Sequence, residues 1–137
     1  MTDNIGQLLF QKFQLLDDCL LNELSKSEFG KISKSQSMVF ACLGGGDVTI
    51  SEIAKRLGIS RQAAQKTVSE LVIKKLLTLK LSQKNKSAKI VKLTPTGSKC
   101  VKLAQDTYAQ IERNISQTIG SERLREFRTV LESDWKL

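Results

Sequence analysis

The sequence predicts a mainly α-helical protein with one small β-hairpin. Apolar residues recur at spacings of three and four near both ends of the chain, which is typical of long amphipathic helices. Two short helical segments separated by a tight turn occupy the middle, and after Lys74 the period changes to the alternation of strands. A length of 137 residues suits one domain with its own core, so we expect residues 1–137 to form a single domain.

A first helix is expected at residues 5–24, where Leu15 and Leu21 widen the apolar stripe. So wide a stripe would leave much apolar surface in water unless the helix also packs on a partner. A short helix around residues 36–43 follows, and we expect the glycines at 44–46 to end it. No Gly-Lys-Ser or Gly-Lys-Thr follows them, so a phosphate-binding loop is disfavoured. The stripe of the first helix is Ile5, Leu8, Leu9, Phe13, Leu16, Leu20 and Leu24.

Two capped helices come next. Thr49, with Glu52 three residues later, forms the pattern of a capping box, and Gly58 supplies the left-handed residue that ends the first of these helices. Ser60 caps the second, which we place at residues 60–74. At about 100° per residue its inner face is Ala64, Thr67, Val68 and Leu71.

A hairpin and two further helices complete the chain. Leu77, Leu79 and Leu81 alternate with polar residues, and the strand AKIVKL returns after a polar tip at residues 83–87. Pro95 at a first helical position starts a long helix, which Gly120 breaks. The stripe of the long helix is Val101, Ala104, Tyr108, Ile111, Ile115 and Ile119, and that of the last helix is Leu124, Phe127, Leu131 and Trp135.

The positive charge is concentrated in one segment. The net charge is +8, but residues 50–102 hold 13 Lys or Arg against two Glu, a local charge of +11, while the remainder carries −3. A local excess of this kind is the electrostatic footprint of a nucleic-acid surface. A solvated basic face is the alternative that charge alone leaves open.

Catalysis and metal binding are disfavoured. The chain has no His, which removes the commonest general base, and no paired carboxylates or cofactor motif appear. Cys19, Cys42 and Cys100 are too widely spaced for a zinc site or a disulfide framework. We therefore expect no enzyme, no cofactor and no metal. No apolar run approaches the length of a membrane span and no secretory signal is visible, so we expect a cytoplasmic protein without a membrane partner.

The helix at residues 60–74 carries the candidate site. Its outward face presents Gln62, Gln65, Lys66 and Ser69, with the short Ala63 between them. A major groove admits one helix, Gln pairs with adenine edges, and Lys reaches guanine or phosphate. Such a face can read base edges, although an ordinary hydrated surface is the alternative. The residues expected on phosphates or the minor groove are Ser60 and Arg61 at the helix start and Lys84, Lys86 and Lys89 on the basic hairpin, residues 82–89. We expect Ile73 to pack beneath the hairpin.

Helix, tight turn, helix and basic hairpin occur in the order of a winged helix-turn-helix. The run TISEIAKRLGISRQAAQKTVSELVIKKLL, followed by AKIVKLTPTG, resembles the MarR (multiple antibiotic resistance regulator) family over nearly the whole chain. The resemblance implies a winged helix-turn-helix at residues 35–97 and dimerisation helices at residues 1–34 and 98–137. It also implies a homodimer on double-stranded DNA and a small-molecule effector.

Two positions depart from the family pattern. Family wings carry an acidic residue and arginines where this chain has Asn85, Lys86 and Ser87, so Lys86 replaces Arg at the minor groove. The family tends to have Gly where Lys75 stands, so the recognition helix either ends differently here or runs on. Some relatives sense oxidants through Cys, but Cys19 falls on the apolar side of its helix, and we expect a packed, structural thiol.

The sequence therefore predicts a sequence-specific, dimeric transcription regulator, more often a repressor in this family. The alternative is a winged-helix module that binds another protein or has an architectural role. The two differ in salt response, since only a DNA reader that neutralises phosphates loses affinity steeply as salt rises.

Overall fold

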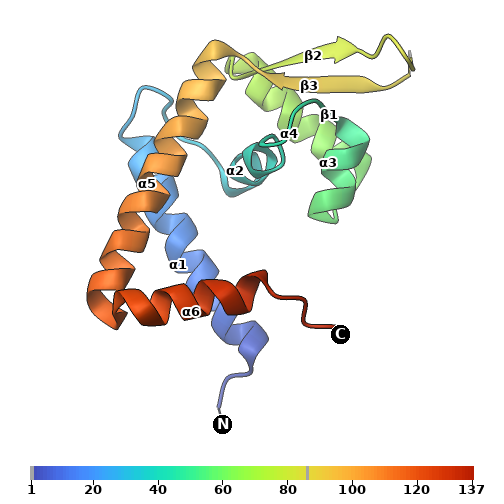
Figure 1. The fold of residues 1–137 in the computed structure, drawn as a ribbon. Coiled ribbons are helices and arrows are strands. Elements are labelled where there is room, and N and C mark those ends of the chain that lie inside the picture. The colour runs from blue at the N-terminus through green and yellow to red at the C-terminus, as the bar shows by residue number, and fades with distance from the viewer. Residues whose placement is uncertain (1, 86) are drawn as a thin grey trace. The chain divides into compact units, whose positions relative to one another are not determined.

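A computed structural model describes residues 2–85 and 87–137, and it confirms the mainly α-helical class with a small β-sheet (Figure 1). The chain divides into two compact units, Met1–Ala104 and Gln105–Leu137, each described here by itself. Among the described residues, none of the helices combines the length and apolar character that a bilayer crossing needs. The elements are α1 (Ile5–Ser25), α2 (Lys34–Ala41), β1 (Val48–Thr49), α3 (Ile50–Leu57), α4 (Arg61–Ile73), β2 (Leu77–Leu81), β3 (Lys89–Leu93), α5 (Pro95–Ile119) and α6 (Ser121–Glu132).

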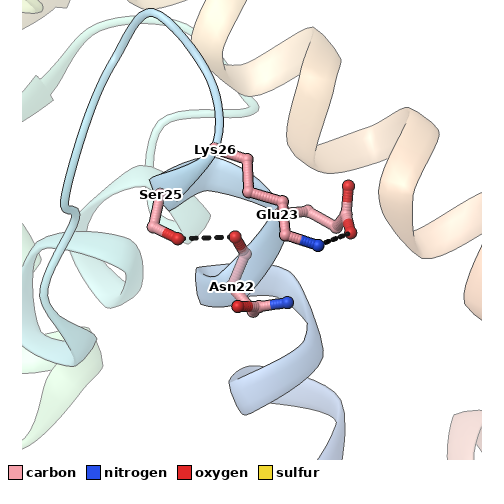
Figure 2. A network of polar contacts seen from close by, with 4 residues as sticks. All are labelled: Asn22, Glu23, Ser25 and Lys26. Carbon is pink, nitrogen blue, oxygen red and sulfur yellow. Dashed lines mark hydrogen bonds and ion pairs between the residues drawn. The ribbon is translucent and has the colours of Figure 1, made fainter.

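Polar side chains define both ends of α1. At its start, the Asn4 side chain accepts from the Gln7 amide at 2.9 Å, and the Gln7 side chain accepts from the Asn4 amide at 2.8 Å. This reciprocal capping box satisfies two backbone donors that the helix leaves unpaired. At its end, the Ser25 hydroxyl donates to the Asn22 carbonyl at 2.6 Å, and Lys26 pairs with Glu23 at 3.4 Å (Figure 2).

Only part of the apolar stripe of α1 is buried. Leu20 and Leu24 are buried, whereas Ile5 is 63% exposed and Phe13 44% exposed. The buried line also includes Asp17, whose pKa is raised by desolvation, against a smaller lowering effect of the nearby Lys34 charge. The expected stripe therefore exists, but most of its N-terminal half lies open in this chain.

Cys19 departs from expectation. It is exposed, so the predicted packed thiol on the apolar side of α1 is wrong for this chain. The physical reason is rotational: the buried positions are Asp17, Leu20 and Leu24, and Cys19 falls between them in sequence but on another side of the helix. Cys42 and Cys100 are buried as expected, and in both burial raises the pKa of the thiol.

The short second helix begins and ends earlier than predicted. Ser33 caps α2 at Lys34, and the cap at the other end is Cys42, so the glycines at 44–46 follow the helix rather than end it. The Ser33 hydroxyl accepts from the Gln36 amide at 3.1 Å, and the Gln36 side chain accepts from the Ser33 amide at the same distance. This local signal sets the start of the helix at residue 34 instead of 36.

The helix-turn-helix agrees closely with the prediction. The Thr49 hydroxyl accepts from the Glu52 amide at 3.1 Å, and Gly58 ends α3 with a φ of 65°. The Ser60 hydroxyl then accepts from the Ala63 amide at 3.0 Å and starts α4. The predicted inner face of α4 is confirmed, since its four residues are all buried: Ala64, Thr67, Val68 and Leu71.

The sheet has one strand more than the hairpin predicted. The strand order is β1-β3-β2, all antiparallel, with β2 and β3 in the register Leu77↔Leu93 to Leu81↔Lys89. The additional strand β1 has two residues and pairs Val48 with Val91. Figure 1 shows β2 beginning near the C-terminal end of α4, from which the hairpin of β2 and β3 extends.

The backbone at Lys75 shows how α4 ends. Lys75 has a φ of 64°, the left-handed conformation that Gly adopts most easily. The Leu76 amide donates back to the Leu71 carbonyl at 3.0 Å, and the Lys75 amide donates to the Val72 carbonyl at 2.9 Å. The helix therefore stops at Ile73 with a left-handed turn, and Lys occupies the position where the family tends to have Gly.

The segment LTPTG joins the hairpin to α5 through very close backbone packing. The Thr94 amide donates to the Leu76 carbonyl at 3.1 Å, and the Thr94 hydroxyl donates to the Lys75 carbonyl at 2.7 Å. The same hydroxyl accepts from the Gly97 amide at 2.9 Å and so caps α5. A Cβ atom at Gly97 would lie 2.0 Å from the Leu76 carbonyl oxygen, which explains why Gly stands there.

The second unit contains the C-terminal part of α5 and the whole of α6. An ion pair joins Arg128 to Glu112, and the hydroxyls of Ser116 and Ser121 lie 2.8 Å apart at the turn between the helices. The Trp135 ring donates to the Val130 carbonyl at 2.8 Å. The unit leaves several large apolar side chains 44% exposed or more: Phe127, Val130, Leu131, Trp135 and Leu137.

Candidate nucleic-acid interface

The outward face of α4 is polar and open. Arg61, Gln62 and Lys66 are exposed, and Gln65 and Ser69 are half-buried at the edge of the same face. The side chain of Ala63 is also exposed and adds little bulk between them. Five of the predicted site residues therefore share one helix surface, opposite the buried face.

Two predicted contacts are occupied by partners within the chain. The Gln65 side-chain amide donates to the Ser69 hydroxyl at 3.1 Å, and the Ser60 hydroxyl accepts from the backbone at the helix start. Gln62 has no such partner among the described residues. Of the two glutamines, Gln62 is thus the freer to meet a base, while Gln65 has to exchange one hydrogen bond for another.

The basic side chains of the segment fall into two groups. Some have partners within the same unit: Arg56 donates to the Cys42 carbonyl at 2.9 Å, and Lys92 pairs with Asp47 at 3.5 Å. The others are exposed and form no ion pair within the part of the chain that the structure describes; among the predicted site residues these are Arg61, Lys66, Lys84 and Lys89. An uncompensated set of this kind attracts a polyanion.

Polar groups of the wing tip, within residues 82–85 and 87–88, bond to one another. The Ser82 hydroxyl accepts from the amides of Lys84 and Asn85 at 3.2 and 3.3 Å. The Asn85 side chain accepts from the Ser87 amide at 3.2 Å and from the Ser87 hydroxyl at 2.7 Å. Lys84 and Lys89 are exposed on either side of this turn, and Lys86 lies outside the described residues.

A partly buried polar network that sequence reasoning missed links α2 to α4. The Gln36 side chain donates to the Glu70 carboxylate at 2.8 Å and accepts from the Lys74 ammonium at 3.1 Å. Lys74 also donates to the Lys31 carbonyl at 2.5 Å. Glu70 is the one acidic residue of α4, and its isolation among basic residues was the signal available in the sequence. The network fixes the C-terminal half of α4 against α2 and the segment that leads into it.

Ile73 does not pack beneath the hairpin, so that expectation is wrong. It is 80% exposed. Leu71, Leu76 and Leu77 are buried, whereas the helical period places Ile73 on the side of α4 opposite its buried face. Ile73 is left on the outward face of α4, in line with Lys66 and Ser69.

These features define a winged helix-turn-helix protein. Residues 32–86 match the MarR family. The chain is also 31% identical over 104 residues to the HTH-type transcriptional regulator TcaR of Staphylococcus aureus (strain Newman), a match that covers 74% of this chain and 69% of TcaR. The chain belongs to the MarR family of transcription regulators.

Solved structures share the fold across almost the entire length. The reduced form of MarR from E. coli has a TM-score of 0.82 at 19% identity, and the match covers 96% of each chain. Bordetella bronchiseptica BpsR has a TM-score of 0.68 at 18% identity and also covers 96% of each chain. At such identities the likeness concerns the fold.

Proposed function

We propose that this chain is a sequence-specific DNA-binding repressor that acts as a homodimer. The outward face of α4 enters the major groove, and the wing at residues 82–89 lies on the backbone or in the minor groove. The observation that carries the proposal is the face itself: Gln62 and Lys66 are exposed, unpaired among the described residues, and set on a segment with a local charge of +11. Gln and Lys at these positions suit adenine and guanine edges.

The proposed dimer rests on apolar surface that each unit leaves open. On α1, Ile5, Phe10 and Leu15 are each more than half exposed, and the second unit exposes Phe127 and Val130 to a similar degree. Exposed apolar side chains concentrated on terminal helices are typical of surfaces that pack against another copy. Sedimentation equilibrium should give twice the chain mass.

A small-molecule effector belongs to the same proposal. The DNA binding of BpsR, a protein of similar fold, is regulated by 6-hydroxynicotinic acid. A library of small aromatic acids, screened for release of a bound duplex, would test whether any effector acts.

Selection of duplexes from a random pool, followed by fluorescence anisotropy over a salt series, tests the central claim. We expect a motif with two-fold symmetry and a steep loss of affinity as salt rises, because bound phosphates release counterions. A flat salt response, or no preferred sequence, would contradict the proposal and favour a protein-binding module.

Two variants separate base reading from phosphate binding. Gln62→Ala should weaken binding to the selected duplex roughly 5- to 150-fold and leave a scrambled duplex unaffected, since one good base contact is worth about 1–3 kcal/mol. Lys84→Ala should weaken both duplexes alike and reduce the salt slope by about one. Equal losses on the two duplexes for both variants would refute the assignment of these residues.

A further inference from the structure

Ile73 is an apolar residue at the C-terminal end of the otherwise polar outward face of α4. Counted at about 100° per residue, it lies between Lys66 and Ser69 on the outward face, and Gln62 lies on the same line. Its exposed fraction of 80% is the highest given for a large apolar residue between the two ends of the chain. Its position therefore extends the line of candidate base-reading residues by one turn.

The charged residues of the last turn do not share this surface. Glu70 and Lys74 are both drawn to the α2 side of the helix, where Gln36 bonds to each of them at 2.8 and 3.1 Å. Lys75 follows the helix in its left-handed turn. Ile73 is consequently the last side chain of α4 on the outward face, with no charged neighbour of its own turn beside it.

We propose that Ile73 is a specificity-determining residue that contacts the 5-methyl group of a thymine in the major groove. This inference rests on the proposed function. Double-stranded DNA is the partner that fits this face. The other residues along it are Gln62, Lys66 and Ser69, whose polar and basic side chains suit a polar, anionic surface. The thymine methyl is the apolar group that base pairs present in that groove.

The geometry of the helix limits which thymine is read. Eleven residues separate Gln62 from Ile73, which is roughly 16 Å along the axis at about 1.5 Å per residue. With roughly 3.4 Å between successive base pairs, the thymine lies within about five base pairs of the base that meets Gln62. Each half of a symmetric site should therefore contain one thymine whose methyl group matters.

Replacement of single thymines by deoxyuridine tests the contact, since it removes the methyl group alone. On the duplex selected by the unmodified protein, each thymine is replaced in turn, and affinity is measured for the wild type, Ile73→Val and Ile73→Ala. We expect one position per half-site at which the wild type loses roughly fourfold, as burial of one methyl group predicts. Ile73→Val should keep most of this loss, and Ile73→Ala should show less than about twofold.

Leu81→Ala is the matched control, because Leu81 is the last residue of β2, outside the wing at residues 82–89, and is a side chain of similar size that is 64% exposed. It should retain the full methyl dependence. The inference is overturned if Ile73→Ala keeps the same deoxyuridine loss as the wild type, if it weakens all duplexes alike, or if it leaves DNA binding unchanged. Failure of the proposed function gives a different result, because the wild-type protein itself then selects no duplex.

Discussion

Gly97→Ala should destabilise the protein, because the added methyl group has no room. An ideal Cβ at this position would lie 2.0 Å from the Leu76 carbonyl oxygen and 3.2 Å from a methyl carbon of Leu93, whereas real Cβ contacts essentially never fall below 3.0 Å. The two backbone segments must therefore separate by about 1 Å. Overpacking of this kind costs about 1–3 kcal/mol, and strain in the hydrogen bond from the Thr94 amide to Leu76 adds roughly 1 kcal/mol.

The better helix propensity of Ala offsets about 1 kcal/mol, so the free energy of unfolding should fall by about 2 kcal/mol. Urea denaturation followed by circular dichroism measures this change. Gly45→Ala is the control, since nothing lies within 4 Å of a Cβ there, and its stability should stay within about 0.5 kcal/mol of the wild type. An unchanged urea midpoint for Gly97→Ala would refute the close approach as the reason for this glycine.

Lys75→Gly should stabilise the protein by about 0.5–1 kcal/mol in urea denaturation, since Gly removes the strain of a φ of 64°; a loss of stability would contradict this account. Gln36→Leu should lower the free energy of unfolding by about 1–3 kcal/mol, because Glu70 and Lys74 lose their shared partner, and an unchanged midpoint would show that the network is dispensable. Burial raises the pKa of Asp17, so the protonated carboxyl favours the folded state. This contribution to stability is present at acid pH and is lost as the pH rises from 3.8 through the raised pKa. Asp17→Asn should therefore be more stable than the wild type at pH 7, with a difference that shrinks towards pH 4, and a difference independent of pH would argue against a buried charge.

Features set by neighbouring residues could be predicted from the sequence. Ser60 and Gly58 mark helix ends through contacts within a few residues, and the apolar spacing on α4 placed its four inner residues correctly. Pro95 likewise marked the start of α5. In each case the determining interaction spans one turn or less, so the residue types alone carry it.

Features that depend on distant partners could not be predicted. The strand β1 exists because Val48 meets Val91, more than forty residues away, and two residues show no alternation. Gln36 carries no local sign that it will bond to Glu70 and Lys74. For Ile73, an apolar residue near a hairpin suggested burial, but the residue lies on the outward face of α4 and is 80% exposed.

The same limit applies to the candidate site. The residues on the outward face of α4 could be named from the helical period, but the contact of Gln65 with Ser69 depends on side-chain conformation. The presence of Lys75 where the family tends to have Gly could be seen in the sequence. The way the helix ends there could not, because the left-handed turn at Lys75 depends on the hydrogen bond from the Leu76 amide back to the Leu71 carbonyl.

The hydrogen bond between Gln65 and Ser69 has a consequence for discrimination among operators. In the proposed complex, base reading by Gln65 would require the 3.1 Å bond to Ser69 to open. An adenine offers both a donor and an acceptor and would compensate the exchange. A base that offers no such pair would leave the bond to Ser69 closed, so Gln65 would favour adenine.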